Sequence, residues 1–283
     1  MSNVIGAKRG RTVALYGDTG SGKTTQIGVL AKWHFKQTGK TTLLRTCDRG
    51  GYRSLEPLVR LGIIRVEEMG PSDDPWTWAN DTASGSRLGT GDVFLAIDSA
   101  TGLGEFILDH ITKESRQIGQ QKTQRFQVAK DLQVGINNES HYGLVQGFMR
   151  DMMWKSTWLT HKGVDVLWTF AMLRGEKQDD TPVLGPMVAG KALTVAIPKW
   201  FERTFRLVSI PGADGEPPRH ALHLQEQPGF AGTGMSFGNA RHPLDATTPL
   251  PAVIEPADLT QALELGEQGQ EEAFNALKEE LGL

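Results

Sequence analysis

The chain has 283 residues, of which 39% are hydrophobic and 22% charged, and this composition is typical of a folded globular protein. No apolar run approaches the roughly 18 residues that a membrane-spanning helix requires. The lone cysteine, Cys47, excludes intramolecular disulfides and multi-cysteine metal sites. Because the first eleven residues are basic and lack the apolar segment of a secretory signal, we expect a cytoplasmic protein with no membrane partner.

The net charge of -3 is unevenly distributed along the chain. Residues 252–283 contain eight acidic residues and one basic residue, a charge of -7, which leaves +4 on residues 1–251. We therefore expect a flexible basic arm over residues 1–11, a core over residues 12–251 and an acidic helical tail over residues 252–283. The basic body suits a polyanion, whereas the tail is more simply interpreted as a solvated amphipathic helix.

The first predicted strand, residues 12–16, leads into a phosphate-binding loop and then a helix up to residue 37. The pattern G-x-x-x-x-G-K-T allows a tight turn whose backbone N–H groups face phosphate oxygens at a helix N-terminus. Lys23 would reach the β- and γ-phosphates, and the Thr24 hydroxyl would hold Mg²⁺. The predicted nucleotide-binding residues are Gly17, Asp18, Thr19, Gly20, Ser21, Gly22, Lys23, Thr24 and Thr25.

A second strand, residues 41–47, follows a turn at Gly39 and ends at Asp48. Because the carboxyl ends of parallel strands meet at one edge of a sheet, Asp48 is a candidate for orienting or deprotonating water beside the γ-phosphate. An Asx turn at the same position explains this aspartate equally well. A helix over residues 52–61, a strand over 63–66 and a helix near 76–83 come next.

The strand predicted over residues 93–99 is almost continuously apolar, as expected of a parallel strand that is covered on both faces. Asp98 at its end is the predicted second Mg²⁺ ligand. Asp98 and Lys23 are therefore both predicted catalytic residues. The alternative is that Asp98 caps the helix predicted over 102–114. Ser99 stands where many ATPases have a glutamate, so Glu105 is a further, weaker candidate for the hydrolytic step.

Residues 115–140 are polar and glutamine-rich, with basic residues that suit phosphate contacts without base readout. A disordered insertion explains the stretch nearly as well. The candidate nucleic-acid contacts in it are Arg116, Lys122, Arg125 and Lys130.

The remainder of the chain predicts a helix over 142–161, a buried strand over 164–171, a charged loop over 173–186 and a helix over 188–197 that stops at Pro198. Alternating residues at 204–210 and 220–225 predict a hairpin with His220 and His223 on its surface. Residues 259–281 predict one or two amphipathic helices, interrupted near 266–269. Strands that alternate with helices predict an α/β fold: a mostly parallel central sheet flanked by helices, with a C-terminal antiparallel hairpin.

Four motifs occur together in an order that resembles phage-encoded RecA/KaiC-like nucleotide-binding proteins, a group that includes RecA-like single-strand annealing proteins. They are Leu15-Tyr16-Gly17 with Gly22-Lys23-Thr24-Thr25, Thr46-Cys47-Asp48-Arg49-Gly50-Gly51, Ala96-Ile97-Asp98-Ser99, and Gly190-Lys191 with Ile197-Pro198-Lys199-Trp200-Phe201. The likeness covers residues 11 to 260.

The resemblance implies a RecA-like P-loop core that binds ATP and Mg²⁺, single-stranded DNA as partner, and a homo-oligomer with nucleotide at the subunit interface, in the host cytoplasm. Arg174 and Lys177 fall where the family has a DNA-binding loop, and Arg241 falls where a basic residue acts across the interface. In the family an Asp-x-Glu often follows the second strand. Here Asp48 is followed by Arg49 and Gly50, which implies slow hydrolysis or ATP-gated binding.

Two other functions compete with this one. A phage assembly or DNA-packaging ATPase would act on a protein partner. A small-molecule kinase would require an arginine-rich lid, and residues 173–186 offer a poor one.

Overall fold

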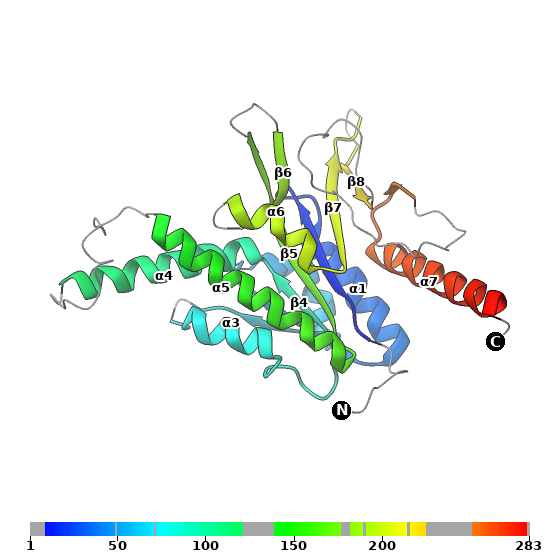
Figure 1. Ribbon diagram of the computed structural model, residues 1–283, viewed down its shortest axis with the longest axis horizontal. Helices are drawn as coiled ribbons and strands as arrows, with labels where there is room; N and C mark the ends of the chain where they lie inside the picture. The colour runs from blue at the N-terminus through cyan, green and yellow to red at the C-terminus, as the bar shows by residue number, and fades with distance from the viewer. Residues whose placement is uncertain are drawn as a thin grey trace.

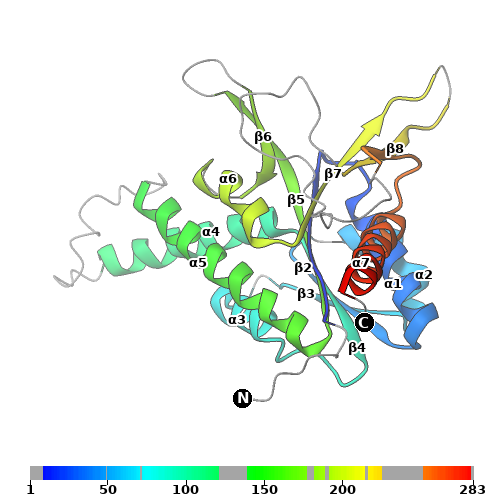
Figure 2. The same ribbon diagram turned by 45° about the vertical axis from the view of Figure 1, so that its right-hand side comes forward.

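The computed structural model describes residues 9–48, 50–70, 72–120, 139–176, 182–188, 191–213, 216–224 and 251–281. In this part of the chain, nine strands form one mostly parallel sheet between two layers of helices (Figure 1, Figure 2). The α/β class predicted from the sequence is therefore confirmed. None of the helices described is long and apolar enough to cross a lipid bilayer.

The sheet has the strand order β3-β2-β4-β5-β1-β7-β8-β9, with β6 paired to the far end of β5. The strands are β1 (Thr12–Gly17), β2 (Thr41–Thr46), β3 (Ile64–Glu68), β4 (Asp92–Asp98), β5 (Asp165–Glu176), β6 (Pro182–Met187), β7 (Arg203–Ile210), β8 (Arg219–His223) and β9 (Val253–Ile254). Strands β3 to β7 in this order run parallel, and β6, β8 and β9 pair antiparallel. The parallel strands thus bring their carboxyl ends to one edge.

The helices divide between the two faces of the sheet. They are α1 (Lys23–Thr38), η1 (Gly51–Leu55), α2 (Glu56–Arg60), α3 (Pro75–Ser84), α4 (Ala100–Gln120), α5 (Glu139–Thr157), η3 (Trp158–Lys162), α6 (Lys191–Trp200) and α7 (Leu259–Leu281). Figure 2 shows α3, α4, α5 and α6 on one side of the sheet and α1, α2 and α7 on the other.

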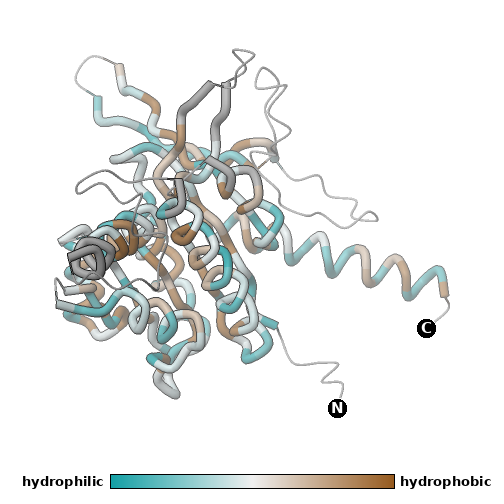
Figure 3. The backbone as a smooth tube through the Cα atoms, turned by 60° about the vertical axis from the view of Figure 1, so that its left-hand side comes forward, coloured by the Kyte–Doolittle hydropathy of each residue, from teal (hydrophilic) through white to brown (hydrophobic). Residues whose placement is uncertain are grey.

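Alternating side chains along each strand build a core on either face. On β1, Val13 and Leu15 pack with α1 and α7, whereas Ala14 and Tyr16 pack with the helices of the opposite layer. This period of two is the natural side-chain spacing of a strand, and burial on both faces explains the continuous apolar runs in the sequence. In Figure 3 the hydrophobic strands run through the middle of the molecule. Cys47 is buried in the same core, where burial raises the pKa of its thiol.

Residues 173–176 and 182–186 belong to strands and not to the predicted loop. Strand β5 continues to Glu176 and forms a hairpin with β6, paired from Ala171 with Met187 to Glu176 with Pro182. This hairpin extends beyond the edge at which β1 ends (Figure 1). Pro182 and Pro186 in the sequence suggested a loop, but an antiparallel edge strand tolerates proline because its outer N–H groups need no partner in the sheet.

The predicted interruption of the C-terminal helix is also wrong, because α7 runs unbroken from Leu259 to Leu281. Gly266 is inside this helix for a packing reason. A Cβ at Gly266 would lie 2.5 Å from the Arg203 guanidinium, which is buried and donates to the Leu263 carbonyl at 3.0 Å. The segment expected as a tail begins inside the fold, since β9 joins the sheet and the first turns of α7 pack on α1.

Helix α6 likewise continues past its predicted end, with Pro198 inside its last turn and its end at Trp200. Proline removes one backbone donor and disfavours a longer helix.

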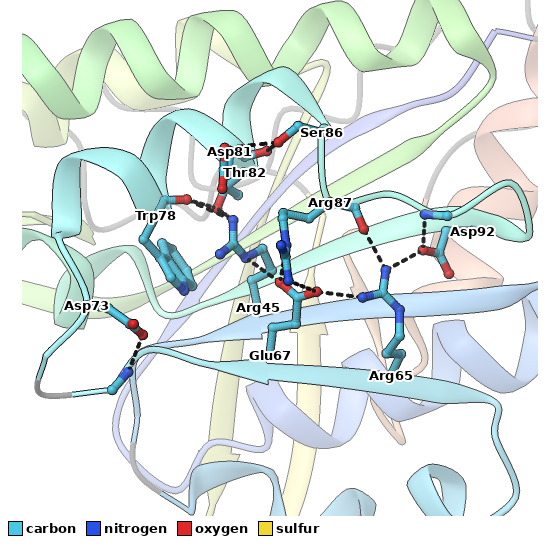
Figure 4. Close-up of polar contacts among 12 residues, drawn as sticks. Arg45, Arg65, Glu67, Asp73, Trp78, Asp81, Thr82, Ser86, Arg87 and Asp92 are labelled. Atoms are coloured by element: carbon cyan, nitrogen blue, oxygen red, sulfur yellow. Dashed lines mark hydrogen bonds and ion pairs between the residues drawn. The ribbon is translucent and has the colours of Figure 1, made fainter.

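A charged network joins α3 to the outer strands of the sheet, as Figure 4 shows. Its centre is Glu67, which lies 3.4 Å from Arg45, 2.5 Å from Arg65 and 3.1 Å from Arg87. The Arg45 guanidinium stacks 4.1 Å over the Trp78 ring and donates to the Trp78 carbonyl at 2.8 Å. Burial lowers the pKa of Arg45 to about 10, because the charged guanidinium is removed from water. The contacts of Arg45 with Glu67 and Trp78 offset this desolvation cost. The network fixes α3 against β2.

Candidate functional site

The loop between β1 and α1 uses its glycines where the backbone requires them. A Cβ at Gly17 would lie 2.3 Å from the Leu207 carbonyl oxygen of β7, so no larger residue fits there. Gly20 and Gly22 have φ values of 80° and 97°, in the left-handed region that other residues avoid. The spacing of glycines in the sequence therefore corresponds to a tight turn in the structure.

This turn presents the N-terminus of α1 to the carboxyl edge of the sheet. Gly22 is the N-cap residue and makes no side-chain cap, and no acidic residue occupies the first turn of the helix. The backbone N–H groups of a helix N-terminus carry partial positive charge and attract anions. A phosphate group fits this position.

Lys23 lies over the same turn. Its Nζ donates to the carbonyl oxygens of Gly17 and Asp18, both at 2.9 Å. Burial lowers the pKa of Lys23, although the carboxylates of Asp98 and Asp48 act in the opposite direction. The ammonium group is thus held in a half-buried position between the loop and the carboxylates.

Asp98, at the end of β4, is 3% exposed and accepts two hydroxyl hydrogen bonds. Thr24 Oγ1 donates to Oδ2 at 2.8 Å, and Thr169 Oγ1 of β5 donates to Oδ1 at 2.5 Å. The cap of α4 is Ser99, whose Oγ accepts from the Gly102 N–H at 3.1 Å, so the interpretation of Asp98 as a cap is wrong. The adjacent oxygens of Thr24 and Asp98 are the hard ligands that Mg²⁺ prefers, so this donor pair fits that ion.

Asp48 follows β2 with its carboxylate in the same cleft. The local turn is closed by backbone, with the Gly51 N–H donating to the Asp48 carbonyl at 3.0 Å, and this leaves the side chain free of an Asx turn. The nearby Ser99 hydroxyl favours the ionised carboxylate and so lowers the pKa of Asp48. The residue as a whole is exposed, but desolvation of its carboxylate in the cleft, followed by the charge of Asp98, raises the pKa of Asp48.

These groups surround a cleft of about 370 Å³. Its lining residues are Thr19, Gly20, Gly22, Lys23, Thr24, Thr25, Asp48, Gly51, Ser54, Asp98, Ser99 and Ala171. Most of the residues predicted from the loop motif are therefore brought together with Asp48 and Asp98. Asp18 affects Lys23, because its charge raises the pKa of Lys23 and its carbonyl accepts a hydrogen bond from Lys23 Nζ. Ser21 lines a neighbouring cleft.

Glu105 is exposed on α4, and its charge contributes to the raised pKa of Asp48. It is outside the set of residues that line the cleft.

Two hydroxyl residues of the site were missed by sequence reasoning. Thr169 is fully buried in the middle of an apolar strand, and a lone polar residue there was the available signal, because a buried hydroxyl needs a partner. Ser99 was noted only as the residue that stands in place of an acid. In the structure it caps α4, and its hydroxyl favours the ionised form of Asp48.

The candidate nucleic-acid residues are mostly beyond what the structure describes. Arg116 belongs to α4 and Arg174 to β5. The other basic candidates lie outside the described residues: Lys122, Arg125, Lys130, Lys177 and Arg241.

In the described parts of the chain, no three His, Cys, Asp or Glu side chains come together as a metal site. Searches of protein-family models and of curated proteins find no significant match to this sequence.

Proposed function

We propose that this chain is a RecA-like P-loop protein of a phage, which binds ATP with Mg²⁺, hydrolyses it slowly, and acts on single-stranded DNA in annealing or recombination. The observation that carries the nucleotide-binding part of the proposal is the hydrogen bond from Thr24 to Asp98. It joins the loop that would hold the phosphates to the carboxylate that would complete the metal shell, in the cleft that also holds Lys23.

Each residue has a defined task in this proposal. Lys23 would exchange the two loop carbonyls for phosphate oxygens, and the N–H groups at the start of α1 would bind the same phosphates. Thr24 and Asp98 would hold Mg²⁺, which when bound neutralises charge on the β- and γ-phosphate oxygens. Asp48 would orient water and accept its proton, a task that its raised pKa favours over that of an ordinary carboxylate.

Asp48→Asn is expected to lower ATP turnover by about 10- to 100-fold while Mg²⁺–ATP affinity stays within about threefold of wild type, because a general base acts on the reaction rather than on binding. Steady-state phosphate release and equilibrium nucleotide binding measure the two quantities separately.

The matched comparison is Glu105→Gln, which removes the same charge from the exposed residue near Asp48. We expect its turnover to stay within about twofold of wild type, since Glu105 is outside the cleft lining. A large loss in Glu105→Gln together with normal turnover in Asp48→Asn would reverse the assignment.

The DNA part of the proposal is tested with the wild-type protein. We expect single-stranded DNA to bind at low salt and to raise ATP turnover, with an affinity that falls steeply as salt increases because phosphate contacts release counterions. Measurements with and without ATP, in a salt titration, follow both effects. If DNA neither binds at low salt nor changes turnover, a protein-directed assembly or packaging ATPase replaces this part of the proposal.

Exposed apolar side chains support assembly with another protein surface, including a second copy of this chain. Phe274, Leu277 and Leu281 are 56%, 48% and 60% exposed on the last turns of α7, which project from the body in Figure 1. Several large apolar residues on one projecting helix mark an interaction site more often than chance exposure does. The homo-oligomer is part of the proposal on this ground.

A further inference from the structure

Exposed apolar side chains gather on two surfaces of the molecule. In the part of the chain that the structure describes, eight large hydrophobic residues are exposed, and six of them lie on α7 or on the continuous segment of α5 and η3. The three on α5 and η3 are Leu144, Trp154 and Trp158, with exposed fractions of 56%, 54% and 58%. Figure 2 shows α5 and α7 on opposite sides of the sheet, so one chain carries two separate apolar surfaces.

The surface on α5 is a stripe along one face of the helix. Positions 144, 147, 154 and 158 are spaced by three, seven and four residues, and such spacings place side chains on one helix face. An added Cβ at Gly147 would meet no atom of the described residues within 4 Å, so the helix surface is recessed between Leu144 and Trp154. The Trp158 ring is held in place, stacked on the His161 ring at 5.2 Å. We name Leu144, Gly147, Trp154 and Trp158 the α5 stripe.

The α5 stripe has a basic border. Residues 150–162 include three basic residues and one acidic residue, a net charge of +2 with histidine neutral. Asp151 is the acidic residue and pairs with Lys155 at 2.6 Å, whereas Arg150 and Lys162 are exposed. An apolar surface with this border fits a partner that is both apolar and acidic.

Helix α7 provides a surface of that kind. Its first turns are fixed to the body, where Trp33 donates to Glu264 at 2.7 Å and Arg11 donates to Glu267 at 2.6 Å. Every residue from Phe274 to Leu281 is exposed. The last eleven residues described, 271–281, include four acidic residues and one basic residue, a net charge of -3. We name this segment the α7 end.

The two surfaces also agree in length. Eleven helical residues span about 16 Å at 1.5 Å per residue, and the α5 stripe spans about 21 Å from Leu144 to Trp158. The α7 end cannot reach the stripe of its own chain, because α7 is unbroken and its first turns are anchored on the opposite side of the sheet.

We propose that the α7 end of one copy of this chain binds the α5 stripe of a second copy. The apolar side of α7 covers the leucine and the two tryptophans, and its acidic residues face Arg150 and Lys162. Because two different surfaces meet, each copy keeps one of each for a further contact, and association proceeds head to tail into a ring or a filament. The inference rests on the homo-oligomer of the proposed function and names the surfaces that form it.

A single-stranded nucleic acid is the competing occupant of the stripe, because bases stack on exposed tryptophans beside basic residues. It would leave the apolar side of the α7 end uncovered, whereas a second copy covers both surfaces at once. The observations therefore favour the second copy.

The test places one aspartate in each surface. Trp154→Asp and Leu277→Asp change residues that are 54% and 48% exposed. We expect each variant to raise the dissociation constant of self-association at least about tenfold, because a charge enters a contact that excludes water. Sedimentation velocity over a range of protein concentrations, with and without Mg²⁺–ATP, measures this constant. Leu61→Asp is the matched control, since Leu61 is 71% exposed and belongs to neither surface, and it should associate like wild type.

An equal mixture of the two variants tests which surfaces meet. The Leu277→Asp copy keeps an intact α5 stripe and the Trp154→Asp copy keeps an intact α7 end. At a concentration where each variant alone is monomeric, the mixture should recover one contact and stop at a dimer. Thermal unfolding checks the fold of each variant, and Trp154→Ala and Leu277→Ala repeat the comparison without a new charge.

The other outcomes overturn the inference. If wild type associates and either aspartate variant associates equally well, the contact does not join these two surfaces, although the homo-oligomer stands. If Trp154→Asp keeps its self-association but loses affinity for single-stranded DNA, the stripe binds nucleic acid instead. If wild type is monomeric under all conditions, the homo-oligomer fails as well, whereas ATP binding is judged separately by calorimetry.

Discussion

Lys23→Ala is expected to weaken ATP binding by about 100-fold, or about 2.7 kcal/mol, the size of one or two charge-assisted hydrogen bonds to phosphate. The side chain is already positioned at the loop by two carbonyl oxygens at 2.9 Å, and neither bond contributes to the helix or the sheet. Its removal should therefore affect the ligand far more than the fold. Calorimetric titration with Mg²⁺–ATP measures the loss, and tripolyphosphate should weaken in parallel.

Lys32→Ala provides the control for this variant. Lys32 is on the same helix and carries the same charge, but its side chain is exposed away from the loop. An equal loss of affinity in both variants would mean that ATP responds to the general positive charge of the helix rather than to Lys23. The phosphate-binding assignment would then be wrong.

The positions of the candidate residues were predictable where chain connectivity alone determines them. A strand, a G-x-x-x-x-G-K-T loop and a helix must be contiguous, so Gly17, Lys23 and Thr24 could be placed from the sequence. Asp98 and Asp48 were also accessible, because each ends a strand in a parallel sheet and such ends share one edge.

The contacts between segments distant in sequence were not predictable in the same way. Thr169 meets Asp98 only because β5 lies between β4 and β1, and no local pattern gives that strand order. The glycine at position 266 could not be explained from the sequence either. It is required because a larger side chain would collide with the buried Arg203. His220 is half-buried because the chain returns after residue 250 to pack beside it.

The hairpin of β5 and β6 shows the limit of reasoning from composition. Glycine, proline and charged residues between 173 and 186 are typical of a loop. Yet Glu176 pairs with Pro182 in register, because an antiparallel edge strand does not need unbroken backbone bonding on its outer side. The pairing of β6 with β5, and not the local composition, therefore determines the conformation of this segment.

Asp98→Asn is expected to separate metal binding from nucleotide binding. The neutral amide can still contact the hydroxyls of Thr24 and Thr169, so the fold should remain, but a strong Mg²⁺ ligand is lost. We expect ATP turnover to fall about 100-fold or more at a Mg²⁺ concentration that saturates wild type. In EDTA the affinity for ATP is expected to change in the opposite direction. Metal-free ATP should bind to the variant as well as to wild type or better, because one negative charge beside the triphosphate is gone.

This opposite sign makes the experiment decisive. A variant that is merely damaged would bind ATP worse with and without metal, whereas loss of a metal ligand weakens only the binding that depends on Mg²⁺. Asp109→Asn on the exposed side of α4 removes the same charge at a distance from the cleft and should change neither quantity. If Asp98→Asn retains the Mg²⁺ dependence of wild type, Thr24 and Asp98 do not form the metal site, and the carboxylate serves only to join β4 to the loop and to β5.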